Sequence, residues 1–424
     1  MAAAAALGSS GHHVTVLEAR PFPGGRATSF PLPGGAEPID NCQHILLRCC
    51  VNLLDFYRRL GVDQSIQFHR EIHFLEPGGR RSVMKRGLLP APLHFAESFA
   101  TLRFLSLAEK LAVARALLAL RRQRHRPDLD RITMLDWLRE QRQPPRAIER
   151  FWRQVLVSAI NEELEHMAAA HGFQVFWLGF LAGRDTYEMG IPSIPLGQLY
   201  SPDAWRALPN VQFRFRTAVR SIETSEDHIA AVVAGDERFT ADAYISALPA
   251  DRLAPLLPSL GLERDAFAPS PITGIHLWFD RPVTTLPHAT LLDRTLQWMF
   301  NKSEGRYLQL VVSASRSLTP LSRQQVIDLA LRELVEFFPA VRDARLERAE
   351  VIKEIHATFS ARPGLESLRP PAATRFSNLS LAGDWTRSGW PATMEGAVRS
   401  GYLAAGHASR LLGTPQVYLL PDIA

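Results

Sequence analysis

The feature that most constrains the fold is a short segment close to the start of the chain. The alanine run 2–7 is followed by a turn at 8–11 and by the β-branched run Val14-Thr15-Val16-Leu17, which ends at Glu18. High helix propensity, stopping glycines and an apolar β-branched run predict a helix, a turn and a buried strand, in that order. This is the second half of a βαβ nucleotide-binding unit, whose terminal acid bonds ribose hydroxyls. We therefore predict that Glu18 is a ribose ligand.

The loop after this strand contains the sequence Gly24-Gly25-Arg26. Adjacent glycines let backbone N–H groups approach a diphosphate, and an arginine can neutralise its charge. Gly24, Gly25 and Arg26 are therefore candidate cofactor-binding residues. Taken with Glu18, they favour a flavin dinucleotide.

A second segment with the same meaning lies near the other end of the chain. Residues 379–382 predict a short strand, Gly383-Asp384 a turn, and 391–405 a capped helix. A helix that begins around Thr393, Met394 and Glu395 presents free N–H groups and a positive dipole end, which would stabilise the N1–C2=O edge of a reduced flavin. Asp384 could accept a hydrogen bond from the ribityl or ribose chain.

Between these segments the chain alternates between helical and strand patterns. Apolar spacing predicts an amphipathic helix from about 88 to 120 and further helix from 134 to about 172. Strands are expected at 211–216, 229–233, 244–247, 272–279 and 307–313, and a helix at 323–338. Because helices and strands are interleaved, we predict two interwoven domains of α/β class. The expected FAD-binding domain comprises 1–45, 205–255 and 375–412, and the mixed α+β substrate domain comprises 46–204 and 256–374.

These segments together resemble the paired FAD signatures of phytoene-desaturase-like and amine-oxidase-like flavoproteins. The matching stretches are 18–26, Leu381-Ala382-Gly383-Asp384-Trp385-Thr386 and Pro391 to Gly401. Within that group, Asp40-Asn41-Cys42-Gln43-His44-Ile45-Leu46-Leu47 resembles the D-N-G-Q-H-V-L-L segment of hydroxysqualene dehydroxylases. That resemblance implies FAD as cofactor and the reductive conversion of hydroxysqualene to squalene for hopanoid synthesis. Cys42 departs from the pattern, which has a glycine at this position.

The resemblance also implies roles for single residues. Val219 would meet the adenine through its backbone, and the segment 247–249 would lie beside the diphosphate. His44 is the candidate acid that protonates the departing hydroxyl, with Asp40 orienting it or touching the cofactor; a packing role for His44 remains an equal alternative. Three aromatic residues are candidates for lining the substrate tunnel or for the core, namely Trp385, Trp390 and Tyr402.

The signatures leave other functions open. A carotenoid desaturase of the phytoene type or an amine oxidase would carry the same motifs and run the hydride in the opposite direction. A flavin-free protein that binds isoprenoid chains is also conceivable, because the strand and G-x-G-x-x-G loop that open this fold are missing ahead of the alanine run. Without that strand, we expect a gap in the parallel sheet with unpaired backbone groups.

Composition limits the location and the partners. The net charge of +5 over 424 residues is too small to imply nucleic acid. Apolar stretches fall short of the roughly 20 residues of a spanning helix, and the start lacks a secretory pattern, so we expect a cytoplasmic protein. Arginines at 121, 122 and 124 follow the helix predicted at 88–120 and form either a solvated helix end or a contact with anionic lipid. No metal is expected, since His166 and His171 are too far apart around a helix.

Overall fold

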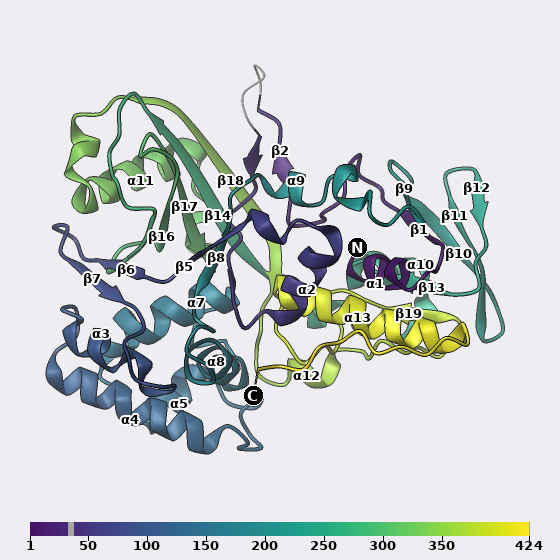
Figure 1. Cartoon of the computed structure of the whole chain (residues 1–424), viewed down its shortest axis with the longest axis horizontal. Helices are drawn as coiled ribbons and strands as arrows, with labels where there is room; N and C mark the ends of the chain where they lie inside the picture. Colours follow the sequence, from purple (N-terminus) through teal and green to yellow (C-terminus); the bar gives the residue numbers. More distant parts are fainter. Residues whose placement is uncertain (33–37, 424) are drawn as a thin grey trace.

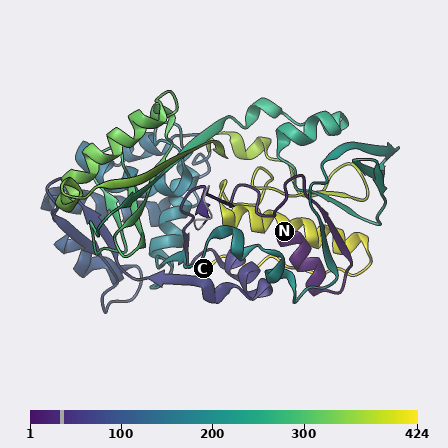
Figure 2. The ribbon, with the colours of Figure 1, turned by 90° about the horizontal axis from the view of Figure 1, so that it is seen from above.

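The computed structural model describes residues 1–32 and 38–423, which form two lobes side by side along the longest axis (Figures 1 and 2). The small-sheet lobe, on the right in Figure 1, contains helices α1 and α13 from opposite ends of the chain. The large-sheet lobe, on the left, contains the longest strands and helices α3, α4 and α5. The predicted mixed α/β class is thereby confirmed, while the bounds of the two domains stay a prediction.

The small-sheet lobe is built on two pairs of parallel strands over two helices. Strand β1 (Val14–Leu17) pairs with β9 (Val211–Arg214), and β13 (Tyr244–Ser246) pairs with β19 (Leu379–Leu381). Both pairs pack on the cluster formed by α1 (Ala2–Ser9) and α13 (Met394–Leu411). An antiparallel meander completes the lobe, with strands β10 (Val219–Ser225), β11 (His228–Ala234) and β12 (Glu237–Phe239).

The two parallel pairs are separate sheets. The amides of Val14 and Glu18 bond to the strand of β9, so the N–H and C=O groups of Thr15 and Leu17 point to the opposite side of β1. Across 1–32 and 38–423, β1 pairs with no strand except β9, and β13 with none except β19. Each pair therefore keeps an open edge, as expected for a parallel sheet that lacks one central strand.

The large-sheet lobe is centred on a seven-stranded sheet in the order β18-β14-β17-β16-β15-β6-β7. Neighbours are antiparallel except β15 and β6, which are parallel. The long strands β14 (Pro269–Phe279) and β18 (Leu346–Phe359) extend towards the small-sheet lobe (Figure 1). The others are β17 (Tyr307–Ser313), β16 (Trp298–Ser303), β15 (His288–Leu291), β6 (Ile72–Leu75) and β7 (Arg81–Met84).

The two faces of this sheet have different roles. Helix α11 (Arg323–Phe337) covers one face, burying Ala330 and Leu334 against Leu277 and Leu310. Its start is fixed by a capping box between Ser322 and Gln325. The opposite face carries a mixture of aromatic and polar side chains and is covered by the loop that contains Cys42.

The predicted helix from 88 to 120 is wrong as a single helix. The structure has α3 (Ala96–Thr101) and α4 (Leu107–Gln123), because Ser106 and Glu109 form a capping box that begins a new helix. The prediction of continuous helix from 134 to 172 is also wrong, since Pro144 and the left-handed Asn161 interrupt it. The observed pieces are α5 (Met134–Glu140), α6 (Pro145–Ala147), η3 (Ile148–Arg153), α7 (Gln154–Ile160) and α8 (Ala169–Phe176).

Shorter elements connect the lobes. The paired ones are β2 (Ser29–Phe30) with β3 (Ile39–Asp40), and β4 (Leu46–Leu47) with β8 (Met189–Pro192) and β5 (Ile66–His69). The helices are α2 (Val51–Leu60), α9 (Leu196–Leu199), α10 (Ala250–Leu256) and α12 (Leu365–Leu368). Single turns are η1 (Asp63–Ser65), η2 (Leu93–Phe95), η4 (Trp177–Leu181), η5 (Pro202–Trp205), η6 (Pro258–Leu260), η7 (Arg264–Ala266), η8 (Arg316–Leu318) and η9 (Pro339–Arg342).

Candidate functional site

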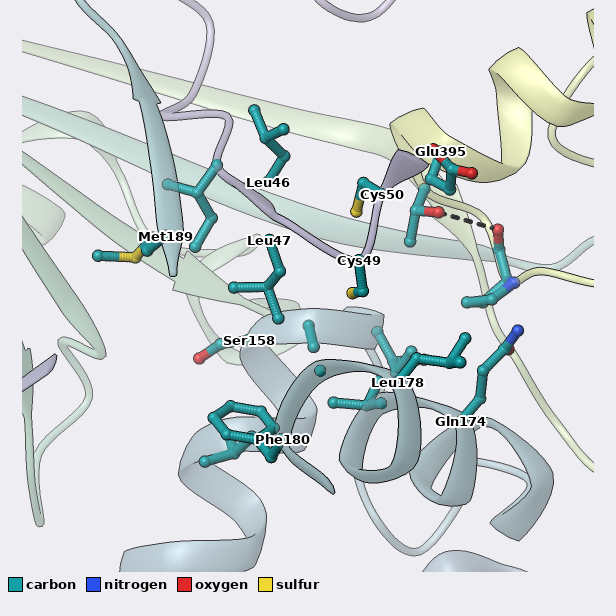
Figure 3. Close-up of a pocket in the computed structure, with 18 of the residues that line it drawn as sticks. Leu46, Leu47, Cys49, Cys50, Ser158, Gln174, Leu178, Phe180, Met189 and Glu395 are labelled. Atoms are coloured by element: carbon teal, nitrogen blue, oxygen red, sulfur yellow. Dashed lines mark hydrogen bonds between the residues drawn. The ribbon is translucent and has the colours of Figure 1, made fainter. Parts of the chain in front are cut away.

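An apolar cavity of about 190 Å³ lies where the two lobes meet (Figure 3). One end is formed by Trp390 and by Thr393, Met394 and Glu395 at the start of α13. Ile72, Phe74, Met84 and Phe180 also line it, and the polar lining includes Gln154, Ser158, Gln174 and Thr290. The cavity can therefore hold a hydrocarbon chain beside the start of α13.

The start of α13 has the geometry expected of an anion-binding helix end. Thr393 is the N-cap, and its Oγ1 accepts a hydrogen bond of 3.1 Å from the amide of Gly396. A Cβ at Gly396 would lie 2.3 Å from the carbonyl oxygen of Pro391, so glycine is required there. The amides of Met394 and Glu395 are at the first helical positions, where the helix itself offers no acceptor. The predicted positive end thus faces the cavity.

The side chain of Glu395 has a different role from the one predicted. Its Oε1 accepts from the side-chain amide of Asn52 at 2.8 Å, and its Oε2 accepts from the backbone amide of Leu53 at 2.7 Å. Burial raises the pKa of this carboxyl. Because the carboxylate caps helix α2, only the backbone of Glu395 is available to a cofactor.

The structure brings together two predicted cofactor residues that are far apart in sequence. The Arg26 guanidinium lies 2.5 Å from the buried Asp384 carboxylate. Its other terminal nitrogen donates to the carbonyl of Ala357 on β18 at 3.0 Å. Gly383 precedes this carboxylate with a φ of 124°, and a Cβ there would lie 2.7 Å from the indole of Trp385. Arg26, Gly383 and Asp384 thus form one polar cluster at the junction of the lobes.

The glycine loop after β1 folds back on the end of that strand. Gly24 has a φ of 118°, and a Cβ on it would lie 2.4 Å from the carbonyl oxygen of Ala27. Arg20 donates to the carbonyl of Gly25 at 2.9 Å, and the Glu18 carboxylate accepts from the amide of Arg20 at 2.8 Å. Glu18 and the glycines therefore lie on one continuous loop. Val219 begins β10, and its adenine contact remains a prediction.

His44 and Asp40 lie on the loop between β3 and β4 but serve separate contacts. The His44 Nδ1 lies 3.0 Å from the carbonyl oxygen of Cys42, and burial lowers the pKa of the ring. Asp40 Oδ1 accepts from Ser29 Oγ at 2.7 Å and from the amide of Leu196 at 2.9 Å. The imidazole is therefore neutral at pH 7, and Asp40 fixes the loop rather than the ring.

Of the three aromatic candidates, only Trp390 lines the cavity. Trp385 packs in a separate core and donates its indole N–H to the carbonyl of Leu248 at 3.1 Å, while Tyr402 donates to Asp55 at 2.8 Å. The sequence analysis missed Gln154 and Ser158, which line the cavity from α7. Their spacing of four residues on one helix face is a signal, although core positions have the same spacing.

The observed donors and acceptors fit a flavin dinucleotide. A carboxylate at the end of a strand, a glycine turn with an arginine, and a helix start beside an apolar cavity supply partners for ribose, diphosphate and the flavin ring. The side-chain hydroxyls of Thr28 and Ser246 are buried without a hydrogen-bond partner in the described part of the chain. In the same part, no cluster of three histidine, cysteine or acidic side chains is arranged to hold a metal ion.

Comparison with known proteins agrees with this geometry. The pattern of the flavin-containing amine oxidoreductase family matches residues 1–408. The chain is 26% identical to a probable zeta-carotene desaturase from Synechococcus elongatus, covering 96% of this chain and 95% of that protein. It is 29% identical to a hydroxysqualene dehydroxylase from Sinorhizobium fredii, over 60% of this chain and 61% of that protein. A structure of putrescine oxidase bound to putrescine superposes with a TM-score of 0.71 at 15% identity, covering 97% and 96% of the two chains.

The family match spans nearly the whole chain, and the residues at the junction of the lobes suit the cofactor that the family uses. The chain therefore belongs to the flavin-containing amine oxidoreductase family and is an FAD-dependent oxidoreductase.

Proposed function

We propose that this enzyme removes the hydroxyl group of hydroxysqualene reductively and releases squalene, a precursor of hopanoids. The observation that carries the proposal is a polar wall inside the apolar cavity. Ser158 Oγ accepts from the indole N–H of Trp298 at 2.8 Å, and Gln154 hydrogen-bonds Thr290 beside it. A pure hydrocarbon offers such groups no partner, whereas a substrate hydroxyl does. The resemblance of 40–47 to the dehydroxylase segment supports the same substrate.

The reaction breaks one C–O bond and forms one C–H bond. Reduced FAD supplies the hydride that the carbon accepts, and the hydroxyl leaves as water after taking up one proton. The chain must therefore bind the substrate away from solvent, hold its hydroxyl at the polar wall and deliver a proton there. His44 is the proposed donor because it precedes Ile45, which lines the cavity. Its neutral ring can pass a proton from one nitrogen to the other.

The substrate class also calls for a lipid surface. Across the described residues, no helix is long and apolar enough to cross a membrane. However, six large exposed leucines lie between 88 and 118, among them Leu88 at 88% and Leu107 at 74% exposure. Leu107, Leu111 and Leu118 share one face of α4, so the apolar stripe predicted for this helix points outward rather than into the core. The exposed residues Arg121 and Arg122 follow on the same helix.

These leucines and arginines, 88–93 and 107–122, form what we call the leucine surface, and we propose that it rests on the inner face of an anionic membrane. An exposed apolar patch flanked by cations is typical of a membrane contact. Phe95 follows the first part of this surface and packs on Phe180, which lines the cavity. A polyprenyl chain could therefore pass from lipid into the cavity without crossing water.

The second candidate is a carotenoid desaturase, favoured by the relative from Synechococcus elongatus that aligns over nearly the full length. The deciding experiment supplies flavin-loaded protein with hydroxysqualene under reducing, anaerobic conditions, and separately with phytoene or zeta-carotene under oxidising conditions. We expect squalene from the first mixture and no new double bonds from the second. The reverse result would replace the proposal with the desaturase, and a primary amine as the only substrate would indicate an amine oxidase. A purified folded protein without flavin colour would support an isoprenoid carrier.

A further inference from the structure

Gln309 on β17 presents an unusual buried amide. Its side chain is 0% exposed, and neither Nε2 nor Oε1 has a hydrogen-bond partner in the described part of the chain. An amide that is removed from water without partners costs free energy, so buried amides in native proteins bond to protein or to ordered water. The position of Gln309 therefore calls for a polar occupant.

The neighbours of Gln309 are also buried and polar. His276 on β14 is directly opposite in the sheet register and so shares the face, and the loop residue Asn41 is buried nearby. Its Nδ1 lies 2.8 Å from the Tyr307 hydroxyl, and its Nε2 lacks a partner of normal hydrogen-bond geometry. The side-chain oxygen of Asn41 is buried and unpaired in the described residues. Since a Cβ on Gly274 would lie 2.8 Å from the carbonyl of Asn41, the loop presses on this face.

Lys302 connects this group to the solvent and to the loop. Its Nζ donates to Gln43 Oε1 at 2.9 Å and lies 3.8 Å from Asp40 Oδ2, while its side chain keeps 22% exposure. Burial lowers the pKa of Lys302, with Asp40 acting in the opposite direction. The titratable groups that face it are Asp40 and His276, with Tyr307 behind His276. Lys302 can therefore release and regain a proton more readily than a surface lysine.

We propose that Asn41, His276, Lys302 and Gln309 form an internal site for ordered water, which carries protons from solvent at Lys302 to His44. Gln43 bonds Lys302 and donates to the carbonyl of His44 at 3.3 Å, so the site lies directly behind the proposed donor. Each turnover of the proposed reaction consumes one proton inside an apolar cavity, and this path supplies it without opening the cavity. The proton role rests on the proposed function, whereas the presence of water does not.

The hydration is tested by the sign of a stability change in the full chain. Gln309→Met keeps the side-chain volume and removes the amide, and Gln143→Met is the matched control. Gln143 is equally buried, but its amide donates to Ala112 at 2.9 Å and accepts from Trp152 at 2.9 Å. If water fills the site, both variants lower the Tm, and a high-resolution crystal structure places water within hydrogen-bonding distance of Gln309. If the site is dry, Gln309→Met raises the Tm while the control lowers it, and the proposal is overturned.

The proton path is tested with flavin-loaded enzyme and hydroxysqualene. Lys302→Met should lower kcat by about tenfold or more, leave KM unchanged and alter the pH profile of kcat. The control Lys353→Met removes a lysine that donates to the carbonyl of Thr319 at 3.0 Å elsewhere on the surface, and should leave all three unchanged. Equal behaviour of the two variants would overturn the proton path. Absence of squalene formation by the unmodified enzyme would instead refute the proposed function, and the Tm comparison would still decide whether the site holds water.

Discussion

Glu395 Oε2 accepts the backbone amide of Leu53 at 2.7 Å, so the first turn of α13 caps the first turn of α2. The two helices start at one end of the cavity, and their relative position depends on a carboxylate that is only 1% exposed. The geometry of the proposed flavin contact is therefore linked to the stability of the surrounding fold.

Replacing Glu395 with alanine should destabilise the protein strongly. The change leaves the amides of Asn52 and Leu53 without their acceptor in a buried place, at a cost of about 2 kcal/mol or more in the free energy of unfolding. Urea unfolding measures this cost. Glu109→Ala is the control because it removes the exposed capping box of α4 and should cost less than about 1 kcal/mol. Equal effects of the two changes would contradict the buried cap.

Asp384→Ala should reduce the fraction of purified protein that carries flavin. The substitution removes a buried acceptor at the junction of the lobes and leaves Arg26 without its ion-pair partner. The ratio of flavin absorbance to protein absorbance gives the occupancy. Asp293→Ala, which removes the partner of Arg150 in the large-sheet lobe, is the matched control and should keep full occupancy. Unchanged flavin in the Asp384 variant would remove this residue from the cofactor site.

His44 should make stability depend on pH in a defined direction. Because burial depresses the folded pKa below the ordinary 6.5, the unfolded chain takes up the proton first. The contribution of the neutral ring is complete above about pH 6.5 and is lost as the pH falls towards the folded pKa. Unfolding midpoints of the unmodified protein and of His44→Gln should therefore approach each other, or cross, on acidification from pH 7 to 5. A constant difference would mean that His44 is not held neutral.

The leucine surface should bind anionic vesicles. We expect Leu111→Glu to lower sedimentation with phosphatidylserine vesicles, because it places a charge within the apolar stripe. Neutralising Arg121 and Arg122 should weaken binding by about 1 kcal/mol each, and added salt should weaken it as well. Leu411→Glu changes an equally accessible leucine outside this surface and should have no effect. Failure of folded, flavin-loaded protein to bind at low salt would end the membrane proposal and leave the enzyme intact.

The elements that could be predicted from sequence are those with a strong local signal. The strand 307–313 and the helix 323–338 agree with β17 and α11, because periodicity and a capping serine are local properties. Periodicity did not tell which face of α4 is buried, since an exposed leucine stripe has the same spacing as a core stripe. The cap of α2 by Glu395 also escaped prediction, because its partners are more than 340 residues away in sequence.

The pairing of β14 with β18 gives the molecule a mechanical property. A strand of 14 residues spans about 45 Å, and its whole central part is hydrogen-bonded to β14. Near the end of this ribbon, Arg26 of the small-sheet lobe binds the carbonyl of Ala357. Such a strut resists bending, so we expect the seam between the lobes to stay shut during turnover. Loading and release would then fall to the helical rim beside Phe95, which makes the lipid-facing side the moving part of the enzyme.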